Sequence, residues 1–403
     1  MVPVLLSGCD AMKTAKPKTP ATAPEKAVAI LSDAPPPPKH PVPTPISALA
    51  ESATSKEEES LVVTNTTSIP ASPNSPDESD AFTVMTWNVE WFFDNEAGDN
   101  YSKLAKEKTM ASRKQWDWKR DSVAAAIDQA RPSVVALQEI ENKRVLFYLR
   151  RSLARNHNLD YNELAVEGGD FFTEQDVGFM YRQPAEKDTK NLLLGIEPVL
   201  VGTFGRSSQM RKDPAFGDVS KHLFARFEVT RGDASEMVTI VTVHLRAGED
   251  SKEIRTKQAR SLHAWLASRI EAGENIIVLG DFNTEDSDIP AVGGTDMFVA
   301  CGFETETKKD DLVDLHQFLP ANERQTHLIA KKSFDRILVS KSLIDDDPSR
   351  NDLAFKKVQR KREINIKGNA DIPDEHWNQY WEIDDANRDI SDHWPVMATF
   401  DFK

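Results

Sequence analysis

The chain has 403 residues and a formal net charge of −15, with 50 Lys and Arg against 65 Asp and Glu. This acidic balance argues against a protein that coats nucleic acid by bulk positive charge. It does not exclude a nuclease, because a metal site supplies positive charge locally. The two cysteines, Cys9 and Cys301, are too few for a disulfide framework.

The first 81 residues differ in composition from the rest. They contain no Trp, Tyr or Phe and 14 of the 23 prolines, with 6 Lys and Arg against 10 Asp and Glu. Such a segment cannot bury enough apolar surface to offset the loss of chain entropy, so we predict a disordered Pro/Ser/Thr-rich tether over residues 10–81. Residues 82–403 hold every Trp, Tyr and Phe, and we predict one large domain there.

The run Leu5-Leu6-Ser7-Gly8-Cys9 resembles a bacterial lipobox, in which the cysteine is lipidated and becomes the mature N-terminus. This resemblance makes residues 1–9 a truncated signal segment and implies a cell-envelope protein, either lipid-anchored through Cys9 or secreted. A signal peptide needs a basic start and a longer apolar stretch than the eight residues before Cys9, a departure that a start codon upstream of Met1 would explain. The alternative is an accidental match in a cytoplasmic protein.

Apolar periodicity and helix-capping residues predict the elements of the first half of the domain. In chain order these are a strand at 82–87, a polar loop at 94–112, a helix from Ser112 to Pro132, a buried strand at 134–137 and a helix at about 143–156. The first strand ends at Asn88, and the second leads directly into Glu139.

In the second half, strands predominate. We predict strands at 177–181, 223–229, 237–243, 276–279, 334–340 and 396–402, and one long helix from Ser251 to about Gly273 with Ile254, Leu262, Trp265, Leu266 and Ile270 on one face. Strands outnumber helices, and the helices fall between groups of strands. This order predicts an α+β fold with two sheets packed face to face and helices outside.

Polar side chains follow many of these strands at the point where the strand ends. They are Asn88, Glu139, His244, Asp281, Asn283, Asp335, Asp392 and His393. Carboxylate and amide oxygens suit Mg²⁺, Mn²⁺ or Ca²⁺, and a histidine beside such an ion suits hydrolysis of a phosphate ester. Taken singly, Asn88 is a common kind of turn residue and the Gly280–Asn283 segment favours an ordinary turn, so only the whole set of motifs indicates a site.

Together the motifs resemble the endonuclease/exonuclease/phosphatase superfamily, over residues 82–403. The motifs are Thr86-Trp87-Asn88-Val89, Leu137-Gln138-Glu139, Val243-His244-Leu245, Gly280-Asp281-Phe282-Asn283, Phe334-Asp335-Arg336-Ile337 and Ser391-Asp392-His393-Trp394-Pro395. The resemblance implies a four-layer α/β sandwich of two mostly antiparallel sheets with helices outside. It also implies a site at one rim between the sheets and a divalent metal, usually Mg²⁺.

The resemblance assigns a metal-binding group. Glu139 is the main ligand, Asp392 a further ligand, and Asn88 lies beside them to fix a metal-bound water or a phosphate. Glu90 falls where abasic-site endonucleases have an acid near the metal, and a plain surface acid is the equal alternative. Mn²⁺ or Ca²⁺ could replace Mg²⁺.

It also assigns the proton-handling groups. Asp281 orients or deprotonates the attacking water, and Asn283 hydrogen-bonds a phosphate oxygen. His393, with Asp335 as its neighbour, is the general base or a phosphate-binding cation. His244 resembles the second histidine of the deoxyribonuclease and sphingomyelinase branches, which donates to a phosphate oxygen or to the leaving group, and Asp176 is a candidate partner for it.

These roles predict in-line attack of water on phosphorus by a nuclease or phosphodiesterase acting outside the cytoplasm, with nucleic acid as the favoured substrate. A phospholipid (sphingomyelinase-like) phosphodiesterase or a polyphosphate phosphatase is the alternative within hydrolases. A catalytically silent envelope binding protein is the alternative from another class. No protein partner is inferred.

The segment 341–390 is long for a connection and carries Lys356, Lys357, Arg360, Lys361 and Arg362, followed by Trp377, Tyr380 and Trp381. Basic and aromatic side chains could hold a nucleic-acid backbone and stack a base, or meet lipid headgroups. A solvated β-ribbon is the favoured interpretation of this segment.

Overall fold

A computed structural model describes residues 81–165, 168, 170–182, 194–202, 221–284, 295–344 and 352–402. Cys9, the signal segment and the tether, apart from Ala81, lie outside the described residues. No helix in the described part of the chain has the length and apolar character needed to cross a membrane.

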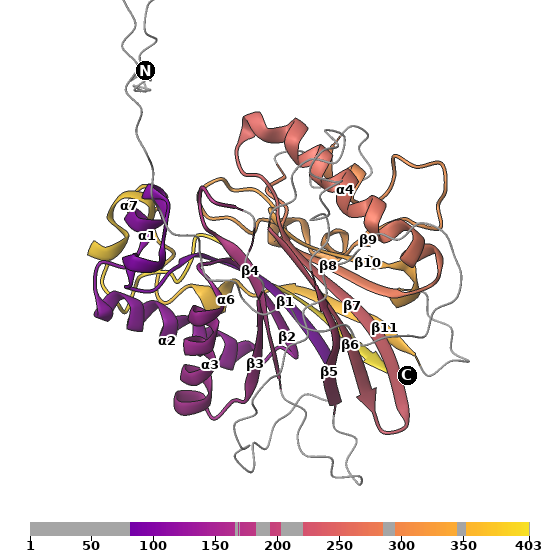
Figure 1. Ribbon diagram of the computed structural model, residues 1–403, viewed down its shortest axis with the longest axis horizontal. Coiled ribbons are helices and arrows are strands. Elements are labelled where there is room, and N and C mark those ends of the chain that lie inside the picture. Colours follow the sequence, from indigo (N-terminus) through magenta and orange to yellow (C-terminus); the bar gives the residue numbers. More distant parts are fainter. Residues whose placement is uncertain are drawn as a thin grey trace, which may run out of the picture. The chain divides into compact units, whose positions relative to one another are not determined.

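The described strands form two six-stranded sheets (Figure 1). The first sheet has the order β11 (Leu353–Arg360), β12 (Val396–Phe402), β1 (Phe82–Phe92), β2 (Val134–Ile140), β4 (Asp176–Arg182) and β3 (Tyr161–Ala165). The second has the order β5 (Leu194–Gly202), β6 (His222–Arg231), β7 (Ala234–His244), β8 (Asn275–Asp281), β10 (Asp335–Ser340) and β9 (Leu312–Asp314). Pairs β1–β2 and β7–β8 are parallel, and the other described pairs are antiparallel.

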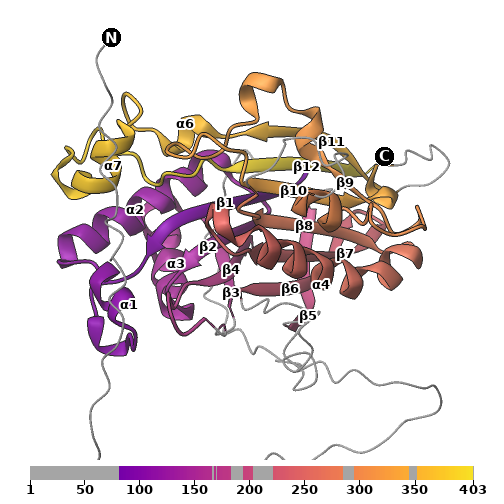
Figure 2. The same ribbon diagram turned by 90° about the horizontal axis from the view of Figure 1, so that it is seen from above.

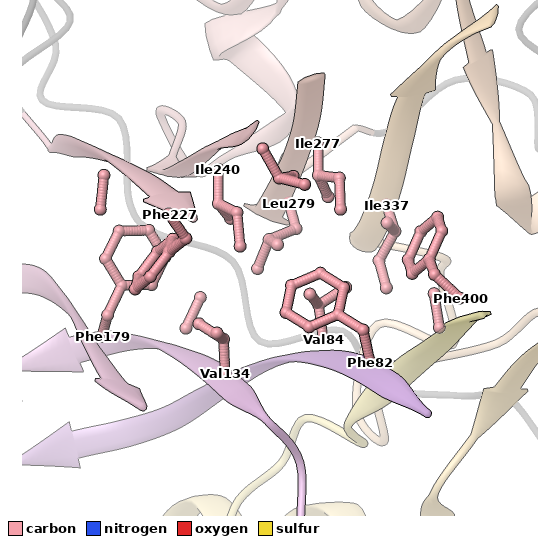
Figure 3. Close-up of a cluster of buried hydrophobic side chains, with 14 of the residues drawn as sticks. Phe82, Val84, Val134, Phe179, Phe227, Ile240, Ile277, Leu279, Ile337 and Phe400 are labelled. Carbon is pink, nitrogen blue, oxygen red and sulfur yellow. The ribbon is translucent and has the colours of Figure 1, made fainter. Parts of the chain in front are cut away.

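The central core lies between the two sheets (Figure 3). Val84 and Val134 of the first sheet belong to the same buried cluster as Ile240, Ile277 and Leu279 of the second. Because side chains alternate across a strand, the intervening residues of each strand face outward. This alternation gives both sheets a second apolar face, which the helices cover.

Helices cover the outer faces of the two sheets, so the fold has four layers (Figures 1 and 2). The helices are α1 (Lys103–Lys108), α2 (Arg113–Ala130), α3 (Lys143–His157), α4 (Lys252–Glu271), α5 (Asp296–Ala300), α6 (Arg362–Asn365) and α7 (Pro373–Gln379). Helices α2 and α3 share a buried cluster with the outer face of the first sheet. Helices α4 and α5 share one with the second. The predicted α+β class, with two mostly antiparallel sheets between helices, is confirmed.

Several local predictions need correction. Helix α1 and a short 3₁₀ turn lie in the segment 94–112, which was predicted as a polar loop. In α4, Ile254 is 44% exposed, and its neighbour Arg255 is fully buried instead. The Arg255 guanidinium bonds the Asp296 carboxylate at 2.8 Å and the carbonyl of Gly248 at 2.6 Å, so a paired cation takes the inward position at this end of the helix.

A buried polar chain joins the two sheets. The Thr86 hydroxyl donates to Gln138 Oε1 at 3.2 Å, and Gln138 Nε2 donates to the Thr242 hydroxyl of the second sheet at 3.0 Å. All three side chains are fully inaccessible to solvent. Because buried hydrogen bonds are directional, this chain fixes how the ends of β1 and β2 lie against the end of β7.

Candidate active site

Strand pairing brings the predicted residues to one rim. In the parallel pair β1–β2, Asn88 aligns with Gln138, directly before Glu139. In the second sheet, His244 at the end of β7 aligns with Asp281 at the end of β8, and Asp281 aligns with Asp335 at the start of β10. Parallel neighbours end at the same edge of a sheet, and the sheets face each other, so the two sets of side chains meet.

Asn88 is the residue that connects the two sheets at this rim. Its Nδ2 donates to Glu139 Oε1 at 3.0 Å and to Asp281 Oδ2 at 2.9 Å, and its Oδ1 accepts from the Glu90 amide at 2.9 Å. The second Glu139 oxygen accepts from the Trp91 amide at 3.0 Å. An amide can approach two carboxylates in this way without adding negative charge.

The backbone around these groups is bent into left-handed geometry. Glu90, Trp91, Glu139 and Asn283 have φ values of 48°, 47°, 61° and 49°. Residues other than glycine rarely adopt such angles, and they cluster at functional sites where the surrounding structure enforces them. Gly280 serves the same rim, because a Cβ at this position would lie 2.0 Å from the carbonyl oxygen of Val243.

His393 lies between carboxylates of both sheets. Its Nδ1 hydrogen-bonds Asp335 Oδ2 at 2.8 Å, while its Nε2 lies 3.7 Å from Asp281 Oδ2 and 3.9 Å from Asp392 Oδ1. Burial opposes protonation, but Asp335 and Asp281 together hold the pKa of His393 well above its usual value. Burial raises the pKa of Asp281 to about 6, with the Asp335 charge adding to the shift.

His244 has the opposite character. Its Nε2 lies 3.6 Å from Asp281 Oδ2 and 3.9 Å from Glu139 Oε1, and its Nδ1 has no hydrogen-bond partner among the residues that the structure describes. Burial, Lys221 and His393 lower the pKa of His244 well below its usual value, so the ring is neutral at pH 7. The candidate partner Asp176 instead accepts a hydrogen bond from the Gly168 amide at 2.7 Å.

The charges of Glu90 and Glu139 both act on Asp392, the third predicted carboxylate ligand. The Asp392 amide donates to Glu90 Oε2 at 3.2 Å, and burial, followed by the charge of Glu90, raises the pKa of Asp392 to about 7, with Glu139 contributing. Asp392 is buried and Glu90 and Glu139 are partly buried, so a cation beside these like charges would stabilise them. Hard oxygen donors of this kind fit a divalent ion such as Mg²⁺.

Asn283 also reaches the site. Its backbone amide donates to Asp281 Oδ1 at 2.8 Å, and its side-chain Nδ2 donates to the carbonyl of Leu245 at 3.1 Å. A side-chain amide carries two N–H groups, so a second donor remains for an oxygen of a bound phosphate.

Sequence reasoning missed His376, which holds Glu90. His376 Nε2 bonds Glu90 Oε2 at 2.9 Å, and its Nδ1 bonds Asp371 Oδ2 at 2.7 Å. Burial opposes protonation of His376, but Glu90 and Asp371 raise its pKa to about 10; burial likewise opposes the ionised form of Glu90, but His376 lowers its pKa to about 2. No local signal marks His376, because its partner Glu90 is 286 residues away in the sequence.

Sequence reasoning also missed His327. Its Nδ1 accepts hydrogen bonds from the amides of Ile329 and Ala330, both at 3.0 Å, and its Nε2 lies 3.5 Å from Asp392 Oδ2. His327, Asp392 and His393 lie close enough to hold a metal ion. However, a ring whose Nδ1 accepts two hydrogen bonds carries its proton on Nε2, so His327 is a hydrogen-bond donor here rather than a ligand.

The geometry agrees with comparisons to known proteins. The sequence profile of the Endonuclease/Exonuclease/phosphatase family matches residues 85–393, and the chain belongs to this family. Members of the family usually hydrolyse phosphoester bonds.

Solved structures with similar folds include a family protein from Bacteroides thetaiotaomicron (14% identity, TM-score 0.50, covering 80% of this chain and 98% of that one). The human Nocturnin catalytic domain with bound sulfate is another (15% identity, TM-score 0.49, 81% and 96%). D. rerio TDP2 complexed with a single-strand DNA product is a third (17% identity, TM-score 0.44, 80% and 100%). Identities this low show the fold alone. No curated protein matches the chain.

Proposed function

We propose that the protein hydrolyses phosphodiester bonds by in-line attack of water, with a divalent metal. The observation that carries the proposal is the bridge through Asn88, which joins Glu139 of the first sheet to Asp281 of the second. It brings the oxygen-ligand group and the proton-handling group into one site, which is the combination that the reaction requires.

Glu139, Glu90, Asp392 and the Asn88 amide would hold the metal, with Mg²⁺ as first choice and Mn²⁺ or Ca²⁺ as alternatives. When bound, the ion offsets negative charge that develops on the phosphate oxygens.

The protein's own groups divide the remaining work. Asp281, whose pKa is raised to about 6, accepts a proton from the attacking water near neutral pH. His393, held as a cation by Asp335, binds a phosphate oxygen. His244 is neutral and donates a hydrogen bond to a phosphate oxygen or to the leaving group. We assign none of these groups a covalent role, so the proposed reaction is a single displacement by water.

We propose nucleic acid as the substrate, and a panel of substrates tests this. The full chain is assayed with Mg²⁺, Mn²⁺ or Ca²⁺ on plasmid DNA, RNA, sphingomyelin, an inositol polyphosphate and bis(p-nitrophenyl) phosphate. EDTA is expected to abolish turnover and added metal to restore it. Cleavage of sphingomyelin alone would replace nucleic acid with a lipid substrate, and failure on every substrate would favour a silent binding protein.

We further propose that the protein works in the cell envelope, anchored by lipidated Cys9. The lipobox-like run before a Pro-rich segment supports this location. The mass of the N-terminal peptide from the native host tests it, since an unmodified Cys9 would remove the anchor.

A further inference from the structure

A pocket of about 370 Å³ lies beside the metal-binding side of the candidate active site. Two segments far apart in sequence form most of this pocket. One is the end of α1 with the residues that follow it, and the other is α7 with the 3₁₀ turn after it. The lining of the pocket includes Glu90, Trp91, Lys108, His376 and Trp377. A volume of this size accommodates a small ring-bearing ligand group.

The pocket and the candidate active site share Glu90. The same Glu90 carboxylate that contacts the Asp392 amide accepts a hydrogen bond from His376. Trp377 follows His376 in α7, so the buried pairing of His376 with Glu90 and Asp371 holds the backbone that carries this indole close to the proposed metal ligands. A ring in the pocket would therefore be held at a defined place beside the reacting phosphate.

The aromatic side chains near the pocket are of two kinds. Tyr380 and Trp381 pack against each other and against the guanidinium of Arg388, which lies 4.7 Å from the Trp381 ring, so these rings stabilise the fold. Trp377 is 69% exposed, and no ring or cation is recorded against it in the described part of the chain. An exposed indole at the mouth of a pocket offers a free stacking surface.

The charges in the pocket limit what the ligand can be. The ammonium of Lys108 lies 5.0 Å from the centre of the Trp91 ring, which is the position that a cationic ligand group would take. A ligand that combines a ring with a phosphate fits better, because its phosphate can pair with the Lys108 ammonium. Two exposed carboxylates, Glu107 and Glu382, also line the pocket and disfavour a polyphosphate.

We propose that this pocket is a nucleobase subsite, in which Trp377 stacks on the base of the nucleotide next to the scissile phosphate and Lys108 contacts that nucleotide's neighbouring phosphate. The proposal deepens the proposed function and rests on it for the identity of the scissile bond. Stacking is tolerant of sequence because every base has a flat face, so the subsite favours nucleotides over other phosphodiesters without selecting one base.

Three small esters with the same leaving group test the subsite. They are the p-nitrophenyl esters of thymidine 5′-phosphate, thymidine 3′-phosphate and methyl phosphate, each assayed with the full chain and Mg²⁺. In Trp377→Ala, KM for at least one thymidine ester is expected to rise about tenfold more than KM for the methyl ester. The control is Phe318→Ala, which removes another exposed aromatic residue outside the pocket and should leave this ratio unchanged.

A calorimetric titration with thymidine 5′-monophosphate in EDTA tests the subsite without turnover. Trp377→Ala is expected to weaken the nucleotide about tenfold, and Phe318→Ala to leave it unchanged. Equal affinities in wild type and Trp377→Ala would overturn the proposal. So would a Trp377-dependent affinity for phosphocholine that exceeds the affinity for the nucleotide.

The two experiments separate this proposal from the proposed function. If the wild-type chain cleaves none of the esters but binds the nucleotide through Trp377, the hydrolase function fails and the subsite stands. If it cleaves all three esters and Trp377→Ala changes their KM values equally, the hydrolase function stands and the subsite is overturned.

Discussion

The two sheets contribute different chemistry to the candidate active site. The first sheet and the loop before β12 carry the proposed oxygen ligands Asn88, Glu90, Glu139 and Asp392, whereas the second sheet carries the proposed proton-handling residues at the ends of β7, β8 and β10. His393 is the exception. It lies next to Asp392 in the loop before β12 of the first sheet, but its side chain bonds Asp335 of the second sheet. Neither half is a site by itself, so the packing of the two sheets is what creates the chemistry.

The largest expected effect comes from the proton-handling half. His393→Ala and Asp281→Ala should each lower kcat by about a thousandfold or more, because general acid–base groups commonly contribute 10²–10⁴-fold. Near-UV circular dichroism should show an unchanged fold. If either variant retained wild-type turnover, the proposed mechanism would be wrong.

The oxygen-ligand half should respond through metal affinity. His376→Ala leaves Glu90 without its partner and is expected to weaken Mg²⁺ binding about 10–100-fold, the usual effect of losing a group that orients a ligand. Calorimetric titration of the metal measures this, and saturating Mg²⁺ should recover most of kcat. The matched control is Asn378→Ala, at an exposed position on the same helix whose side chain, within the described ranges, bonds only a carbonyl of its own helix. Unchanged metal affinity in His376→Ala would show that Glu90 does not bind the ion.

The contact between the halves should appear in the pH profile. The Asp335 carboxylate helps hold the pKa of His393 above its usual value, so Asp335→Asn lowers that pKa. His393 is a cation at pH values below its pKa. As the pH rises, the variant with the lower pKa loses this cation earlier, and it loses the activity that depends on the cation earlier too. The alkaline limb of the kcat/KM profile should move to lower pH. If the alkaline limb did not move, its ionisation would belong to a group other than His393.

The smallest effect should come from the buried link between the sheets. Thr242→Val removes the acceptor of Gln138 Nε2 and leaves a buried donor unpaired, at a cost of about 1–3 kcal/mol in the free energy of unfolding. Urea denaturation measures this change. Thr239→Val, a second threonine of β7, provides a comparison. A lower kcat under conditions in which the variant is still fully folded would show that the link also sets the geometry of the site.

Much of the site could be predicted because its signals are local. Glu139 and Asp281 each follow a short apolar run, and the strand assignment alone places them at strand ends. His376 has no such signal, since α7 lies in a polar segment and its partner Glu90 is distant in sequence. The aromatic residues of this segment could not be told apart from the sequence either. The sequence identifies Trp377, Tyr380 and Trp381 as one group, and only their packing shows that Arg388 covers the last two and leaves Trp377 exposed.

The fold shows the same division. Strands with long apolar runs, such as β8, lie where the sequence predicts them. Strand β11 carries exposed Lys356 and Lys357 and a bulge beside Phe355, so its alternation is interrupted and its edge position is set by pairing with β12. Ile254 faces outward because the buried Arg255–Asp296 pair decides the orientation of that helix end, and such a pair is formed only in three dimensions.

The left-handed backbone conformations of Glu90 and Glu139 are strained, and this strain is located at the candidate active site. Glycine would relax both positions, but replacing Glu90 would also leave the His376 imidazolium without this carboxylate partner. Replacing Glu139 would instead reduce the repulsion on Asp392. A descendant freed from selection for turnover is therefore expected to become more heat-resistant when Glu139 is replaced. Under the proposed function, Glu139 supports turnover and at the same time lowers the stability of the fold.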